Sequence, residues 1–276
     1  MNVLISSFVI FKIFISDYYQ MISRIILIFF LLTTSKLTIA QDNVMTTEQP
    51  DSIVNDSNNY KLGYRKLILP VSLISAGAIS FAIPPMKELD LSAKIEVAHD
   101  RPGKTTLDNY TQYFPAVMVY GLNLAGIKGK HGFKDRTIIY ATSQLISAAI
   151  VTPAKNLIAE ERPDGSNRKS FPSGHAATAF STAHFMYREY RDNNLLLSLS
   201  GYPFAAFTGV YRVLNNKHWM TDVVAGAGVG ILSTELAYWL YPKMNTLISG
   251  KKKNNKSVVV PYYQSKGLGM SYLLVF

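Results

Sequence analysis

Residues 218–241 read HWMTDVVAGAGVGILSTELAYWLY, a polar start followed by a long apolar run that carries a row of small residues. The run has close to the roughly 20 residues that an α-helix needs to cross a bilayer. Gly226, Gly228 and Gly230 would give this helix a face on which a neighbouring helix can approach closely. The stretch therefore predicts the last helix of a compact helical bundle.

Five further apolar segments precede this helix, and most of them also approach a spanning length. They are Leu67–Ile83, Tyr113–Ile127, Thr137–Leu157, Ser173–Tyr190 and Leu195–Arg212. The second is the weakest, because it carries Pro115 and Asn123. We therefore expect an all-α fold, a six-helix bundle embedded in a membrane, as the domain over residues 61–245.

The composition lies between that of a membrane protein and that of a large helical soluble protein. The chain is 48% apolar and 17% charged, against about 25% charged residues in typical soluble domains. Its net charge is +10, but the sequence has no nucleic-acid motif, and the basic residues lie mostly at the ends of apolar segments. The absence of cysteine excludes disulfides, thiolate metal sites and a thiol nucleophile.

The N-terminus has the pattern of a targeting segment. Arg24 precedes the apolar run 25–32, and small or polar residues lead to Ala40. This arrangement predicts that residues 1–40 are a signal peptide or a retained N-terminal anchor. Residues 41–60 are polar and predict a flexible linker. Both alternatives deliver the chain to a membrane or beyond it.

Basic residues between the apolar segments predict the orientation. They are Lys128, Lys130, Lys134, Arg136, Arg188, Arg191, Lys251, Lys252, Lys253 and Lys256. If all six segments span, these residues share one face, which the positive-inside rule makes cytoplasmic. The polar clusters described below would then face the periplasm or the exterior of the cell envelope. A cleaved signal peptide would reverse this arrangement unless one segment does not span, and Tyr113–Ile127 is the candidate.

The C-terminal residues 246–276 differ from the rest of the chain. A basic stretch is followed by Val258–Val260 and then by alternating apolar residues that end at Phe276. This pattern predicts two short strands joined by a turn, a hairpin-like tail appended to the bundle.

Three short polar clusters interrupt the apolar sequence. They are Lys155-x6-Arg162-Pro163, Pro172-Ser173-Gly174-His175 and Arg212-x5-His218-x3-Asp222. In the first, Lys155 and Arg162 are seven positions apart, so their side chains can leave one face of a helix end. Arginine offers a fork and lysine a point charge to phosphate oxygens. Taken alone, the pair could instead be basic residues that favour a helix C-terminus.

The second cluster opens a helix. Ser173 is a suitable N-cap, and Gly174 lets the backbone approach a ligand closely. Free N–H groups at such a helix start bind anions. His175 lies in the first turn, where it can reach the bridging oxygen of a phosphoester. The alternative is an ordinary capped helix with a surface histidine.

The third cluster carries the most chemistry. His218 and Asp222 are four positions apart and share a helix face. A carboxylate beside an imidazole fixes its tautomer and stabilises the cation formed when the other nitrogen attacks phosphorus. Arg212 can reach the same pocket and neutralise oxygens. A surface His–Asp pair is the alternative, but unpaired ions are costly in a segment this apolar.

The three clusters together suit the hydrolysis of a phosphoester, in which the cations bind a phosphate, His218 attacks it and His175 protonates the leaving group. A zinc site formed by His175, His218 and Asp222 is conceivable. The three basic residues argue against it, because they already supply the charge of a metal, so we expect neither metal nor cofactor. Among the other histidines, His184 should pack inside the bundle, whereas His99 and His131 are expected in loops without partners.

The order and spacing of the clusters resemble the type 2 phosphatidic acid phosphatase family, which includes class A acid phosphatases and vanadium haloperoxidases. The family pattern is Lys-x6-Arg-Pro, Pro-Ser-Gly-His and Ser-Arg-x5-His-x3-Asp, and residues 155–222 meet it. One position departs, because Tyr211 stands where the family has serine. Since Arg212 keeps the charge, we expect the departure to cost little.

The resemblance implies a metal-independent phosphatase that acts on phosphomonoester or diphosphate bonds through a phosphohistidine. His218 is then the nucleophile, Asp222 orients it, and His175 is the general acid and base. The groups implied to bind phosphate are Lys155, Arg162, Ser173, Gly174 and Arg212.

The expected substrate is a phosphorylated membrane lipid, since apolar helices let its chains stay in the bilayer while the headgroup reaches the cations. Two alternatives remain open. One is a secreted acid phosphatase acting on small soluble phosphomonoesters. The other is a non-catalytic envelope protein that binds lipid headgroups, although binding alone needs the cations and not the His–Asp pair.

Overall fold

The structure is a computed structural model that describes residues 60–100, 105–248, 256–264 and 267–275. The predicted signal peptide or anchor, and the predicted linker as far as residue 59, lie outside these residues and stay predictions.

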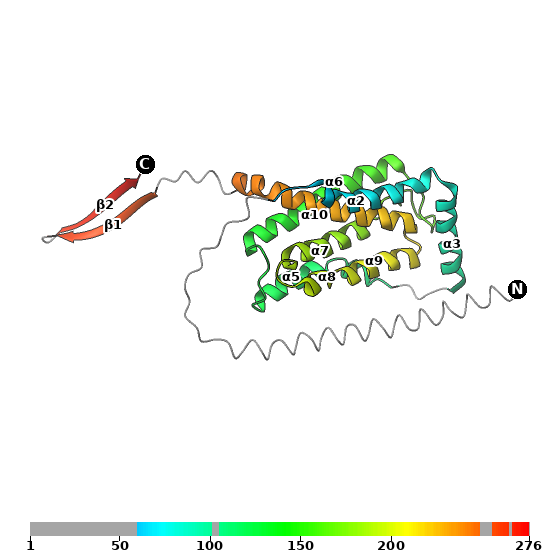
Figure 1. Ribbon diagram of the computed structural model, residues 1–276, viewed down its shortest axis with the longest axis horizontal. Helices are drawn as coiled ribbons and strands as arrows, with labels where there is room; N and C mark the ends of the chain where they lie inside the picture. The colour runs from blue at the N-terminus through cyan, green and yellow to red at the C-terminus, as the bar shows by residue number, and fades with distance from the viewer. Residues whose placement is uncertain (1–59, 101–104, 249–255, 265–266, 276) are drawn as a thin grey trace. The chain divides into compact units, whose positions relative to one another are not determined.

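The described residues between 60 and 248 are helical wherever they have regular structure, which confirms the all-α class for this part (Figure 1). The elements are α2 (Tyr64–Ala78), the 3₁₀ turn η2 (Ile79–Phe81), α3 (Pro84–Asp100), α4 (Asp108–Thr111), α5 (Phe114–Leu124), α6 (Phe133–Ile158), α7 (Gly174–Tyr190), α8 (Leu195–Leu199), α9 (Tyr202–Leu214) and α10 (Met220–Ile248).

Helix α10 is the central element of the bundle. It packs along α2, α6 and α7, and α9 packs against the other side of α7 (Figure 1). The apolar core between α5, α6, α7 and α10 includes Val119, Ile139, Phe185 and Ala237, all fully buried. The helix predicted from residues 218–241 therefore organises the packing of the others.

The row of glycines on α10 permits this packing. A Cβ on Gly226 would lie 2.5 Å from the carbonyl oxygen of Ser173, and one on Gly228 would lie 2.6 Å from that of Pro70 in α2. A Cβ on Gly230 would collide with the carbonyl oxygen of Ala177 in α7. The predicted close-packing face is confirmed, and it serves two neighbouring helices at once.

Hydroxyl groups hold the same interface from inside. Ser143 of α6 lies 2.7 Å from Ser181 of α7 and 3.0 Å from Thr234 of α10, measured between side-chain oxygens. Ser181 and Thr234 are themselves 3.1 Å apart. These buried groups satisfy one another, which explains how apolar helices carry so many serine and threonine residues.

Fewer helices than expected are long enough to cross a membrane. In the part of the chain that the structure describes, two helices qualify by length and composition, Phe133–Ile158 and Met220–Asn245. A third span would require the pair Tyr64–Phe81 and Pro84–Val97, which is bent by 89°. The expectation of six nearly spanning segments is therefore too high. Helix α5 has 11 residues, and the segment Leu195–Arg212 is interrupted between α8 and α9.

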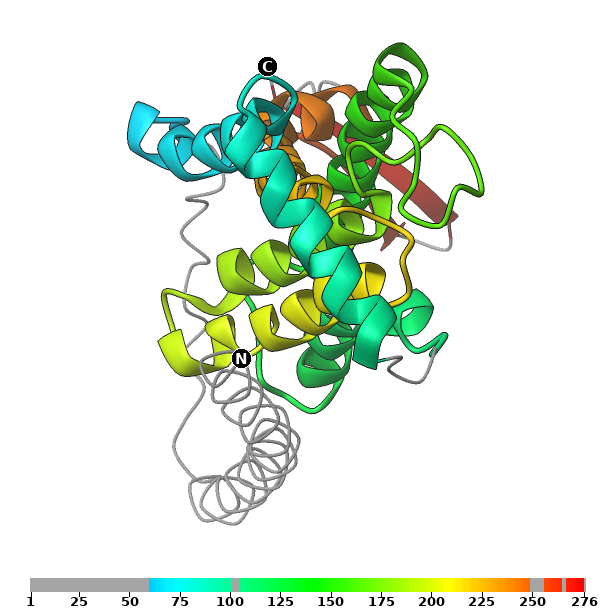
Figure 2. The ribbon, with the colours of Figure 1, turned by 90° about the vertical axis from the view of Figure 1, so that its right-hand side faces the viewer.

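Helix α3 was not expected from the sequence. The segment Leu67–Ile83 was predicted to end at Pro84, which is correct, but the chain starts a new helix there instead of a loop. Proline is tolerated in the first turn of a helix. Figure 2 shows α3 crossing the end of the bundle. It has no strong apolar stripe, which is why the sequence pattern does not reveal it.

The C-terminal tail contains a pair of antiparallel strands. Strand β1 (Lys256–Gln264) pairs with β2 (Gly267–Val275), so that Lys256 lies opposite Val275 and Gln264 opposite Gly267.

The packing of α10 predicts the effect of adding one methyl group. Gly230→Ala should lower the free energy of unfolding by about 1–3 kcal/mol, because the new Cβ meets backbone atoms that cannot move aside. Gly121→Ala in α5 is the matched control, since nothing lies within 4 Å of its Cβ position. It should be neutral or stabilising by up to about 1 kcal/mol. Denaturant unfolding in detergent measures both, and equal stabilities would contradict the predicted contact.

Candidate active site

The end of α6 brings the first and second polar clusters together. The Lys155 ammonium donates hydrogen bonds to the carbonyl oxygens of Lys169, at 2.7 Å, and Ser170, at 3.1 Å. Both acceptors belong to the loop that leads into α7. A Cβ on Gly174 would lie 3.9 Å from Lys155 Cε. The cation is therefore fixed beside the N-terminus of α7.

The loop before α10 is tied to the loop after α6. Lys217 Nζ lies 2.7 Å from a carboxylate oxygen of Asp164, and the Trp219 indole donates to the carbonyl oxygen of Glu161 at 2.8 Å. These contacts join the segment that carries Arg162 to the segment that carries His218. The third cluster thereby meets the first.

His218 and Asp222 form a buried pair at the start of α10. His218 Nδ1 lies 3.5 Å from Asp222 Oδ2, and the two side chains are 2% and 0% exposed. The same oxygen accepts hydrogen bonds from Ser170 Oγ at 2.5 Å and from the Trp219 backbone N–H at 2.9 Å. Since Nδ1 faces the carboxylate, Nε2 is the nitrogen left to react.

The first turn of α7 adds the second histidine. Ser173 is the N-cap, and its Oγ accepts from the Ala176 N–H at 3.4 Å, as predicted. The Ser173 N–H donates to the Asp222 carbonyl oxygen at 3.0 Å, which fixes α7 to α10. His175 Nε2 lies 2.8 Å from Oδ1 of Asn109.

Two guanidinium groups complete the cluster. Arg212 is 8% exposed, and its Nη1 lies 3.0 Å from Asp108 Oδ2. The Nε atoms of Arg162 and Arg212 are buried and have no hydrogen-bond partner among the described residues. A buried donor without a partner costs free energy, so these atoms are suited to an anion that enters the cluster.

Burial, with the neighbouring cations adding to it, sets the protonation of the histidines. Burial lowers the pKa of His218 to about 4, although the Asp222 carboxylate acts in the opposite direction. Burial, with the charge of Arg212 adding to it, lowers the pKa of His175 to about 4. Both imidazoles are therefore neutral at pH 7, the form in which histidine is a nucleophile or a base.

Comparison with known families matches the segment that carries the three clusters. Residues 136–246 match the family model of the PAP2 superfamily, and this range contains all three clusters. This part of the chain is similar to the PAP2 superfamily. The resemblance drawn from the spacing of the clusters is thereby confirmed.

Two curated relatives are similar to parts of the chain. The lipid A 1-phosphatase of Porphyromonas gingivalis is 37% identical over 137 residues, which are 49% of this chain and 31% of that protein. The bacitracin transport permease protein BcrC of Bacillus licheniformis is 29% identical over 76 residues, 28% of this chain and 36% of that protein. The chain thus matches about a third of the length of these relatives.

One solved structure is also similar. The crystal structure of Aquifex aeolicus LpxE has 18% sequence identity and a TM-score of 0.40, and the match covers 53% of this chain and 93% of that one.

Sequence reasoning missed several residues of the candidate active site. Asp108 and Asn109 lie in the short helix α4, and no motif singles them out. Ser170 lies two positions before the second cluster and was not considered. Asp90 of α3 accepts from the Thr221 backbone N–H at 3.1 Å and so caps the start of α10. Each of these acts across the fold, so spacing along the chain carries no signal for it.

Three histidines outside the candidate active site test other expectations. His184 is buried, as predicted, and bonds to Tyr202 and Glu235 at 2.7 Å each. His131 was expected to lack a partner, which is wrong, because it is buried with Nδ1 2.7 Å from Glu189 Oε1. His99 was expected in a loop but belongs to α3.

Two further expectations concern Tyr211 and a metal. Tyr211 is half-buried and packs against the ring of Phe207 at 4.4 Å between centroids. Within the described ranges, no group of three His, Asp or Glu side chains is arranged to hold a metal ion. The zinc alternative built on His175, His218 and Asp222 thus finds no support in the geometry.

Glu160 is a second carboxyl group behind the His218–Asp222 pair. Burial, with the neighbouring Asp222 carboxylate adding to it, raises the pKa of Glu160 well above its usual range. Glu160 Oε2 and Asp222 Oδ1 are buried and have no hydrogen-bond partner in the described part of the chain. A proton on Glu160 therefore satisfies both oxygens at neutral pH and holds the Asp222 carboxylate in place.

This contact predicts a dependence of stability on pH. Because the pKa of Glu160 is raised on folding, the contact is present at neutral pH and is lost as pH rises through that pKa. The melting temperature of the wild-type protein should fall as pH rises from about 4.5 to about 9, whereas that of Glu160→Gln should not, since an amide keeps its donor. The exposed neighbour Glu161→Gln is the control and should follow the wild type. Parallel profiles over this pH range for all three proteins would contradict a protonated Glu160.

Proposed function

We propose that this protein is a phosphatase that removes a phosphoryl group from a phosphorylated membrane lipid through a covalent phosphohistidine at His218. The observation that carries the proposal is the buried His218–Asp222 pair beside cationic donors that lack partners among the described residues. A structural ion pair would need the carboxylate but would not need unpaired guanidinium nitrogens around it. A phosphate would satisfy them.

The proposed binding step uses the whole cluster. The three cations, Lys155, Arg162 and Arg212, hold the non-bridging oxygens of the phosphoryl group. The first backbone N–H groups of α7, beginning at Gly174, add donors at a helix N-terminus. A Cβ on Gly174 would meet Val151 and Lys155 only at ordinary van der Waals distances, so packing alone does not require glycine there. This supports a role for Gly174 in the close approach of a ligand.

In the proposed first chemical step, Nε2 of His218 attacks phosphorus and the bond from phosphorus to the bridging oxygen breaks. The leaving oxygen takes a proton from His175. The bound phosphate dianion offsets the charge of Arg212, which otherwise lowers the pKa of His175, and so allows this imidazole to be protonated. Asp222 stabilises the positive charge that develops on His218.

In the second step, a water molecule attacks the phosphorus atom of the phosphohistidine, and His175 accepts a proton from this water. The nitrogen–phosphorus bond breaks, and inorganic phosphate and neutral His218 are regenerated. The cations stabilise the charge on the three equatorial oxygens in both steps. Their positive charge is the ground for proposing that no metal ion takes part.

The proposed substrate class is a phosphorylated lipid of the cell envelope. Support comes from the two long apolar helices, α6 and α10, which place the cluster at their ends. Support also comes from a relative named lipid A 1-phosphatase. We further propose that the cluster faces the periplasm or exterior, since Lys130, Arg188 and Arg191 gather at the other end of the helices.

The nucleophile assignment predicts the effect of one substitution. His218→Ala should lower kcat for phosphate release by about a thousandfold or more, because the covalent route is removed. The exposed His99→Ala is the matched control and should keep wild-type turnover. Purified proteins are assayed on lipid A, phosphatidic acid, undecaprenyl diphosphate and p-nitrophenyl phosphate.

Substantial turnover by a folded His218→Ala protein would contradict the nucleophile. Release from p-nitrophenyl phosphate but from none of the lipids would favour a phosphatase of soluble esters instead. Vanadate should inhibit the wild-type enzyme as a phosphate mimic, and activation by vanadate would favour haloperoxidase chemistry.

A further inference from the structure

A basic pocket lies at the end of the bundle opposite to the candidate active site. It has a volume of about 320 Å³ and contains five lysine or arginine side chains and one aspartate. The lining residues are Tyr60, Lys61, Lys66, Lys130, His131, Arg188, Arg191, Asp192, Tyr238 and Tyr241. Arg188 is 13 positions after His175 on α7, so the two sites are about 20 Å apart along the helix axis.

Arg188 is the central group of this pocket. Its side chain is 7% exposed, and its guanidinium carbon lies 4.6 Å from the ring of Tyr60 and 5.2 Å from that of Tyr238. Its Nε is buried without a hydrogen-bond partner among the described residues. The two rings thus hold a charged group in a fixed orientation while some of its hydrogen-bonding capacity stays unused.

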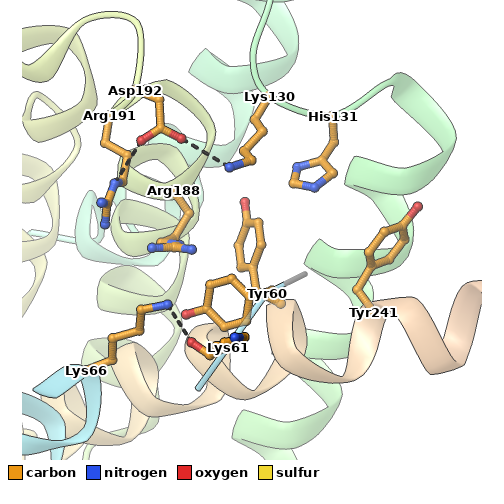
Figure 3. A pocket seen from close by; sticks show the side chains of 10 residues that line it. Tyr60, Lys61, Lys66, Lys130, His131, Arg188, Arg191, Asp192 and Tyr241 are labelled. Atoms are coloured by element: carbon orange, nitrogen blue, oxygen red, sulfur yellow. Dashed lines mark hydrogen bonds and ion pairs between the residues drawn. The ribbon is translucent and has the colours of Figure 1, made fainter. Parts of the chain in front are cut away.

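Further cations converge on the same space. Figure 3 shows Lys66, Lys130 and Arg188 pointing towards one another from different elements. Lys66 Nζ lies 3.7 Å from the Tyr60 ring centroid and donates to the carbonyl oxygen of Lys61 at 2.8 Å. Like charges brought this close repel one another, so the arrangement calls for an anion.

The acidic groups nearby do not supply that anion. Asp192 is shared between Lys130, at 3.1 Å, and Arg191, at 3.2 Å. Glu189 is buried against Arg136, His131 and Tyr238. Glu235 bonds to His184 and to the hydroxyl of Tyr60. In the described ranges, no carboxylate forms an ion pair with Arg188 or Lys66.

We propose that this pocket is a second anion site, which binds a phosphate-bearing ligand between Arg188, Lys66 and the neighbouring basic side chains. The guanidinium, oriented by two tyrosine rings, suits the oxygens of a phosphate, and the lysines add point charges. The ligand is either a lipid phosphate headgroup or free phosphate. Basic pockets between membrane helices bind anionic headgroups in this way. The pocket contains none of the residues of the three clusters.

The structural alternative is that Arg188 serves only to stabilise the C-terminal end of α7. A cation near a helix C-terminus is favourable, and so is its stacking on the tyrosine rings. This alternative accounts for Arg188 but not for the convergence of Lys66, which lies on α2. The two roles differ in whether an anion binds.

The test measures anion binding to the full chain in detergent. A background with Lys155→Gln and Arg162→Gln weakens anion binding at the catalytic end. Isothermal titration is then performed with inorganic phosphate and with dihexanoylphosphatidylglycerol, and dihexanoylphosphatidylcholine controls for the acyl chains. We expect saturable binding of at least one of the two anions. Binding of inorganic phosphate identifies free phosphate as the ligand, and binding of the phosphatidylglycerol alone identifies a lipid headgroup.

Substitutions then locate the site. Adding Lys66→Gln and Arg191→Gln should weaken the binding at least about tenfold, because charge-assisted contacts are lost. The matched control is Lys243→Gln, an exposed lysine near the same end of α10 that does not line the pocket, and it should leave the binding unchanged. Lys61→Gln, at an exposed lysine of the pocket, should weaken binding as well and guards against misfolding of the paired variant.

The proposal is overturned if neither anion binds, or if phosphate does not bind and both short-chain lipids bind alike. It is equally overturned if the Lys66, Arg191 and Lys61 substitutions leave the affinity unchanged.

Discussion

The fully buried Asp222 is the group on which the arrangement of the candidate site depends. Its carboxylate accepts from Ser170 and from the backbone of Trp219, and it faces Nδ1 of His218. Its backbone carbonyl accepts from the N-cap residue of α7. One residue therefore joins the loop after α6, the start of α7 and the start of α10. Because these segments carry the three polar clusters, Asp222 joins the clusters into one candidate site.

The close contact of α7 with α10 extends this arrangement along the bundle. Gly226 and Gly230 remove the side chains that would separate the two helices. Hydrogen bonds between buried hydroxyl groups then supply polar contacts between these otherwise apolar helices. The ends of α7 differ in consequence. Its N-terminus contributes backbone donors and His175 to one site, while its C-terminal turn contributes Arg188 to the basic pocket. A rigid helix thus links two clusters of positive charge without bringing them together.

The sequence predicts which residues come together in the candidate site better than it predicts the elements that hold them. The cluster residues from Lys155 to Asp222 could be named because their types and spacing are specific, and the structure brings them close together. The glycine row of α10 was equally readable, since a row of small residues in an apolar helix indicates close packing. Asp108 and Asn109 could not be found, because they reach the site from helix α4, which no pattern connects to it. Glu160 lies inside the first cluster, but its position in the sequence does not show that its carboxyl group lies beside Asp222. Helix α3 was not predicted for a different reason, which is that its apolar residues form no stripe.

The spanning helices show a related limit. Apolar composition predicted six segments of near-spanning length, yet residues such as Gly201 and Pro203 divide the segment Leu195–Arg212 into α8 and α9. An apolar composition indicates that a segment is buried. It does not distinguish burial inside a helical bundle from burial in lipid.

The central claim is that an imidazole held by Asp222 becomes covalently phosphorylated. The most direct measurement mixes the purified protein with a lipid phosphate substrate for milliseconds, quenches it in alkali, which preserves phosphohistidine, and maps the modified residue by mass spectrometry. The account predicts a phosphoryl group on the peptide that contains His218, which forms and then disappears as phosphate is released. Turnover at full rate with no phosphorylated histidine at any time, or with the phosphoryl group on His175 instead, would contradict it.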